Sequence, residues 1–194
     1  MSPELTERLN SLHKRILKED VRSGRGLGNE LGFFIFDYDP SSELDIRQQI
    51  PNIIAKANAL SPDLKIAEVD VFEQLMGVLE DQDLLERALE LEDKIGLPQA
   101  LEAIRTAATP SEVAARIVRL HPPGETDLYI LHNIGDCYPL IRAHAVLTNL
   151  HTPVRGRSVI LFFPGKYSGR RLSLFNALED SNYYRAFRLF DEQC

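Results

Sequence analysis

The chain has 194 residues, 44% of them apolar, and a formal net charge of −7. It is long enough to bury one core without disulfides, and its acidic balance argues against broad non-specific DNA binding. The two cysteines are far apart in the sequence, so they give neither a disulfide framework nor a repeated metal-binding spacing. We therefore expect a single domain over residues 1–194 in a reducing cytoplasmic setting, with no signal peptide, no membrane span and no cofactor.

The first third of the chain alternates helical and strand patterns. Residues 3–20 carry leucines at helical spacing behind a Ser-Pro start, which predicts a capped amphipathic helix. A buried strand is expected at residues 33–36. A helix capped by Ser41 or Ser42 should then run to about residue 60, although Pro51 should kink or interrupt it.

Two of the predicted strands end in a carboxylate. Asp37 follows the strand at residues 33–36, and Asp70 follows a strand predicted at residues 64–69. If the two strands are parallel neighbours, these side chains lie at the same edge of the sheet, where a Mg²⁺ site is often built. The alternative is that each aspartate caps the helix that follows it.

A long helical stretch separates the second strand from the third. Residues 71–121 are helical in pattern, and about fifty residues exceed what one crossover helix needs. The sequence therefore predicts a helical insertion at about residues 71–121. Its acidic middle is either a solvated face or a docking surface for a partner.

The remaining strands follow a clear Pro-Pro-Gly break. A third strand is expected at residues 127–131, followed by a helix at 138–150 with Pro139 in its first turn. Residues 158–163 form an apolar run that predicts a central strand buried on both faces, stopped by the Pro-Gly pair that follows. A fifth strand is predicted near residues 186–190.

This alternation predicts an α/β fold. We expect a mostly parallel, Rossmann-like sheet of about five strands, with helices on both faces and right-handed crossovers. In such folds, sites gather outside the carboxyl ends of the strands. The sequence contains no Walker A, GxSxG, HExxH or CxxC motif, so no catalytic or metal-binding residue is nominated.

Three segments supply candidate residues for binding a partner or an anion. The first is a Gly-rich loop at residues 24–30, which precedes a strand and so does not match a dinucleotide fingerprint. The second is the basic, Gly-containing loop after the fourth strand. The third is the Asn-Tyr-Tyr-Arg segment at residues 182–185, which is either a partner-facing patch or a buried corner. The candidate residues are Arg25, Asn29, Glu30, Gly165, Lys166, Tyr167, Arg170, Arg171, Tyr183, Tyr184 and Arg185.

Three longer sequence segments resemble a known family. They are GLGNELGFFIFDY (26–38), NIGDCYPLIRAHAVLTNL (133–150) and FFPGKYSGRRLSLFNALEDSNYYRAFRL (162–189). The chain resembles the BrxB family, a small component of the BREX bacterial phage-exclusion systems that was long described as a domain of unknown function. The resemblance covers nearly the whole chain.

The resemblance implies a role in anti-phage defence within a complex of BREX proteins. The expected direct partner is PglZ, the alkaline-phosphatase-like member of these systems, ahead of the methyltransferase and the large AAA ATPase. The family supplies no established catalytic residues, so none is carried over.

Two classes of function therefore stay open. One is a non-catalytic assembly subunit that docks through the strand-edge loops or the helical insertion. The other is a nucleotide- or metal-dependent hydrolase, or a nucleic-acid-binding factor, that uses the strand-end carboxylates and the basic loop. Direct binding of nucleic acid by the chain alone is not expected.

Overall fold

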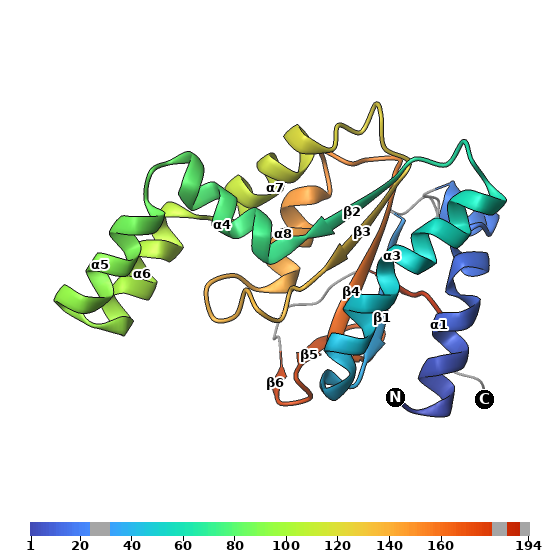
Figure 1. The fold of residues 1–194 in the computed structure, drawn as a ribbon, viewed down its shortest axis with the longest axis horizontal. Coiled ribbons are helices and arrows are strands. Elements are labelled where there is room, and N and C mark those ends of the chain that lie inside the picture. The colour runs from blue at the N-terminus through green and yellow to red at the C-terminus, as the bar shows by residue number, and fades with distance from the viewer. Residues whose placement is uncertain (24–31, 180–185, 191–194) are drawn as a thin grey trace.

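The computed structural model describes residues 1–23, 32–179 and 186–190, and it has three layers with a twisted sheet in the middle (Figure 1). Five strands of this sheet are parallel, in the spatial order β2-β3-β4-β1-β7. Their bounds are β1 Phe33–Tyr38, β2 Ile66–Asp70, β3 Leu128–His132, β4 Ser158–Tyr167 and β7 Phe187–Arg188. The predicted α/β class with a mostly parallel sheet is confirmed.

Helices cover both faces of the sheet, and each face has its own hydrophobic core. On one face, α1 (Pro3–Ile16) and α3 (Glu43–Leu60) pack against the strands. On the other face lie α4 (Val71–Asp81), α7 (Pro110–Leu120) and α8 (Ala143–Leu150). Right-handed crossovers place α3 on the opposite face from α4, α7 and α8, because the connection from β1 to β2 runs in the opposite direction to those from β2 to β3 and from β3 to β4.

The segment predicted as a helical insertion forms four helices between β2 and β3. Besides α4 and α7, these are α5 (Leu85–Ile95) and α6 (Leu97–Ala107). The helices α5 and α6 pack against each other and project away from the body of the molecule (Figure 1). We call this pair the helical arm.

Two predictions about the first helices need correction. The helix expected at residues 3–20 ends at Ile16, and a separate short helix, α2 (Glu19–Arg22), begins after Lys18 adopts an extended conformation. The Ser2 cap is confirmed, since its side chain accepts a hydrogen bond from the Leu5 amide at 3.1 Å. Pro51 does not interrupt α3, which is continuous over 18 residues with Pro51 on its exposed side.

The strand β4 does not stop at Pro164 and Gly165 as the sequence suggested. It pairs with β1 as far as Pro164, and from Gly165 it pairs in antiparallel fashion with β5 (Leu172–Leu174). A Cβ at Gly165 would collide with the Ser173 carbonyl, so glycine allows the two strands to approach. The Pro-Gly pair therefore marks a change of partner. We call the extended end of β4, its turn at residues 168–171 and β5 the basic hairpin.

The segment after β3 also differs from the prediction. The helix expected at residues 138–150 begins only at Ala143, and residues 135–140 form turns that include a cis Tyr138–Pro139 bond. Pro139 therefore lies in the loop rather than in a first helical turn. After β5 the chain turns back into β6 (Leu178–Glu179), which pairs with β5 in antiparallel fashion. The last strand predicted from the sequence corresponds to β7.

The central position of β4 makes a direct prediction about stability. Phe162 is fully buried, and its ring centroid lies 5.0 Å from that of Phe36 on the neighbouring strand. We expect Phe162→Ala to lower the free energy of unfolding by about 3–5 kcal/mol, because it removes an aromatic side chain from the core and leaves a cavity. Urea denaturation measures this loss. The exposed Leu60 provides a control, since Leu60→Ala should change stability by less than about 0.5 kcal/mol. A cost below about 1 kcal/mol for Phe162→Ala would contradict a central β4.

Candidate functional site: the carboxyl edge of the sheet and the basic hairpin

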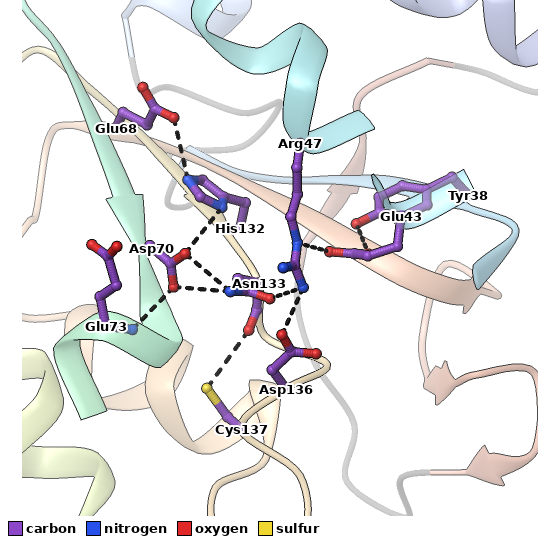
Figure 2. Close-up of polar contacts among 10 residues, drawn as sticks. All are labelled: Tyr38, Glu43, Arg47, Glu68, Asp70, Glu73, His132, Asn133, Asp136 and Cys137. Carbon is purple, nitrogen blue, oxygen red and sulfur yellow. Dashed lines mark hydrogen bonds and ion pairs between the residues drawn. The ribbon is translucent and has the colours of Figure 1, made fainter. Parts of the chain in front are cut away.

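Asn133 sits at the centre of a polar network at the carboxyl edge of the sheet (Figure 2). It follows β3 directly, is buried, and has a φ of 63°, a left-handed conformation that Asn tolerates better than most residues. Its Nδ2 donates to both carboxylate oxygens of Asp70, at 3.2 and 3.0 Å. Its Oδ1 accepts a hydrogen bond from Arg47.

Arg47 bridges α3 to the loop after β3. Its Nε donates to Glu43 at 3.0 Å and its Nη2 to Asp136 at 2.7 Å, while Glu43 also accepts from the Tyr38 hydroxyl at 2.6 Å. Burial alone would lower the pKa of Arg47, but the hydrogen bonds to Asp136 and Glu43 raise it. Burial and the adjacent Glu43 carboxylate raise the pKa of Tyr38. Both side chains therefore keep their protons across the physiological range.

Asp70 closes the other end of the network. It caps α4 by accepting from the Glu73 amide at 3.0 Å, and it lies 3.9 Å from His132 Nδ1. His132 Nε2 in turn lies 3.4 Å from Glu68, so the imidazole stands between two carboxylates. The polar side chains of this edge thus form one continuous network from Tyr38 to Glu68.

Cys137 lies beside this network but has the properties of a structural thiol. It is fully buried, and burial, followed by the charges of Asp70 and Asp136, raises the pKa of the thiol to about 12. The reactive form of cysteine is the thiolate, and a protonated buried thiol is inert. Cys137 therefore lacks the properties of a nucleophile.

The two strand-end carboxylates predicted to share a metal do not meet. β3 and β4 lie between β1 and β2, so Asp37 and Asp70 are about 14 Å apart, three strand spacings. Asp37 instead binds Arg8 of α1 at 3.2 Å and the Tyr167 amide at 3.0 Å. The helix-capping alternative is correct for Asp70 but not for Asp37. Within the described part of the chain, no group of three or more His, Cys, Asp or Glu side chains could hold a metal ion.

The basic hairpin carries five of the predicted binding residues. Gly165 allows β5 to approach β4 closely. Tyr167 is buried, and its hydroxyl donates a hydrogen bond of 2.7 Å to the Ala186 carbonyl. Lys166, Arg170 and Arg171 are exposed. The other predicted residues, Arg25, Asn29, Glu30, Tyr183, Tyr184 and Arg185, lie outside the described residues.

A groove of about 1140 Å³ lies between α1 and the basic hairpin. Gly165, Lys166, Tyr167 and Arg171 line it, together with residues of α1 and the end of β1. Its described charged lining is mixed: the basic side chains are Arg8, Lys166, Arg171 and Arg188, and the acidic ones are Glu4, Glu7, Asp37, Asp39 and Glu179. A mixed lining fits a polar protein surface better than a polyanion such as nucleic acid.

Sequence reasoning missed the residues that hold the carboxyl edge together. Arg47 and Glu43 are four residues apart on a helix, a spacing that predicts a local ion pair but not the contact with the loop after β3. Asn133 offered one usable signal, since it lies just beyond the strand predicted at residues 127–131, where Asn is a common left-handed residue. The contact between these residues depends on strand order, which the sequence did not supply.

Together these features define a Rossmann-like α/β protein in which the polar side chains at the carboxyl ends of β2 and β3 are paired with one another, while a groove opens at the ends of β1 and β4. Comparison with known proteins then gives the family. The model of the family described as "BREX protein BrxB" matches residues 67–189. A "BREX protein BrxB" of Bacillus cereus (strain H3081.97) is 36% identical over 193 residues, covering 97% of this chain and 98% of that protein.

A second "BREX protein BrxB", from Escherichia coli O9:H4 (strain HS), is 31% identical over 189 residues, covering 97% of this chain and 93% of that protein. The chain therefore belongs to the BrxB family of BREX proteins, and this membership supports a role in anti-phage defence. No solved structure matches the chain. None of the helices in the described part is both long and apolar enough to cross a membrane.

The network makes a prediction that separates hydrogen bonding from backbone strain. Asn133→Gly keeps the left-handed backbone but removes the bonds to Asp70 and Arg47, so it should cost about 1–3 kcal/mol of unfolding free energy. Asn133→Ala should cost about 1–2 kcal/mol more, because alanine adds a Cβ to the left-handed conformation. Urea denaturation of both variants tests this order. Equal stability of the two variants would mean that the backbone conformation carries no cost.

Proposed function

We propose that this protein is a non-catalytic assembly subunit of a BREX anti-phage complex. The observation that carries the proposal is the closed network at the carboxyl ends of β2 and β3, part of the edge where α/β proteins normally bind ligands. There Arg47, Asn133 and Asp70 are bonded to one another rather than directed at open space. Family membership supports the setting, since both curated relatives are BREX proteins.

The partner that the family resemblance implies is PglZ, and we propose that it docks on the basic hairpin. Lys166, Arg170 and Arg171 are exposed at this hairpin on a chain with a net charge of −7. Such a local basic site attracts an acidic surface and orients the encounter. The hairpin is also well fixed, because the Tyr167 amide binds Asp37, so its turn presents the arginines without a large ordering cost.

The helical arm is the second surface that extends from the body. Its helices α5 and α6 project away from the body of the molecule, and the acidic stretch of residues 80–93 runs from the end of α4 into α5. The arm would suit a basic partner, whereas the hairpin suits an acidic one. Added negative charge should therefore weaken docking of an acidic partner on the hairpin but favour docking of a basic partner on the arm.

Charge reversal at the hairpin turn tests the docking proposal. We expect Arg170→Glu with Arg171→Glu to weaken the complex with purified PglZ by about 1–3 kcal/mol, mainly through slower association, because rim charges act on the encounter. Biolayer interferometry at two salt concentrations measures both rates, and higher salt should weaken the wild-type complex. The melting temperature should stay nearly unchanged, since both side chains are exposed.

A matched control is Lys56→Glu with Arg155→Glu, which makes the same change in net charge at exposed positions away from the hairpin. This control should leave PglZ binding close to that of the wild type. Equal binding by the hairpin variant and the wild type would exclude the hairpin as the docking surface. Failure of the two purified proteins to co-elute at concentrations well above micromolar would contradict assembly with PglZ itself.

The alternative function, a nucleotide- or metal-dependent hydrolase, makes a separate prediction. An enzyme that used Asp37 would show Mg²⁺-dependent nucleotide turnover that Asp37→Asn abolishes. Our proposal predicts no turnover and no change in melting temperature on addition of MgATP, because Asp37 is already bound by Arg8 and the Tyr167 amide. A phosphate-release assay and thermal melting test this. Turnover by the wild type that is lost in Asp37→Asn would overturn the non-catalytic proposal.

A further inference from the structure

A small apolar pocket opens between the loop after β3 and the strands β5 and β6. Its apolar lining consists of Ile134, Ala143, Phe163, Leu172, Leu174 and Leu178. Its free volume is about 30 Å³, room for about two water-sized groups and so for the end of one aliphatic side chain. Among the described lining residues it shares only Leu172 with the groove beside α1, so it is a separate site.

Exposed apolar side chains continue the pocket onto the surface. Phe175, in the turn after β5, is 42% exposed, and Leu178, at the start of β6, is 38% exposed, an unusual state for two large apolar residues so close in sequence. Phe175 has a φ of 55°, a left-handed conformation that bulky residues rarely adopt. Its ring rests against Gly135, where an added Cβ would lie 3.1 Å from a ring carbon. The turn thus holds an aromatic ring at the surface in a strained conformation, a feature that clusters at binding sites.

Two hydrogen-bond donors stand at this otherwise apolar pocket. Arg142 lines it and is exposed, and its guanidinium forms no ion pair or hydrogen bond with any residue that the structure describes. Tyr138 also lines the pocket, and its hydroxyl has no hydrogen-bond partner among those residues. A guanidinium and a hydroxyl are together suited to a carboxylate, which accepts from both. The pocket therefore combines an apolar hole with two residues whose donors suit a carboxylate.

We propose that this pocket docks a segment of a partner protein in which an aliphatic side chain stands beside an aspartate or glutamate. The aliphatic side chain fills the pocket, the carboxylate binds Arg142 and Tyr138, and the partner covers Phe175 and Leu178. A partner segment fits better than a small molecule, because the hole holds only a few atoms while the apolar rim around it is open. The site goes beyond the assembly proposed at the basic hairpin, and it can be tested without PglZ.

The test uses the full chain labelled with ¹⁵N and the probe N-acetyl-Leu-Asp-amide. We expect saturable chemical-shift changes at residues 134–142 and 172–178, with a dissociation constant of about millimolar, as suits so small a probe. Arg142→Gln should weaken binding about fivefold, the effect of an exposed ion pair. Leu178→Ser should also weaken it, and N-acetyl-Leu-Asn-amide should bind the wild type about as weakly as the aspartate probe binds Arg142→Gln. Both substituted residues are exposed, so both variants should fold.

Three results would overturn the proposal. The first is the absence of shifts at these residues with about 20 mM probe, well above the expected dissociation constant. The second is equal affinity for the aspartate and asparagine probes, with Arg142→Gln unchanged, which would exclude carboxylate recognition. The third is a chemical-shift change at the same residues when the protein concentration is varied without probe. That result would identify a second copy of this chain as the occupant.

Discussion

The fold depends on the burial of β4 on both faces and along both edges. This strand pairs with β3 and β1 in the sheet, and its extension pairs with β5 outside it. Its side chains alternate between the two hydrophobic cores, so Phe162 contributes to one face and Phe163 to the other. One strand therefore fixes the sheet and also positions the hairpin that carries Arg170 and Arg171. The surface proposed for docking is held by a strand in which every residue except Lys166 is buried.

The strand order has a second consequence at the carboxyl edge. Because β3 and β4 separate β1 from β2, the carboxylates Asp37 and Asp70 act apart, each in its own network. Asp70 is joined through Asn133 to Arg47, so these polar groups are bonded to one another. Asp37 ties α1 to the basic hairpin. Residues that suggested catalysis in the sequence thus organise surfaces in the structure, which fits a subunit that works by assembly.

The sequence predicted the fold well where continuous apolar runs marked buried strands, as at residues 33–36 and 158–163. It failed where tertiary pairing decided the outcome. Pro164 and Gly165 are strong breakers locally, yet β5 supplies a new partner and the strand continues. Arg47 could not be linked to Asp136, 89 residues away, without the strand order. The exposed basic residues were identifiable from composition and turn pattern, whereas the acidic side of the groove comes from α1 and β1, far away in sequence.

The proposed function rests on the docking of a partner on the basic hairpin. Hydrogen–deuterium exchange of the full chain, with and without saturating PglZ, tests it most directly, because it maps the contact without any substitution. If PglZ docks there, residues 166–174 should exchange more slowly in its presence. Protection confined to the helical arm, or no protection anywhere at saturating PglZ, would contradict it.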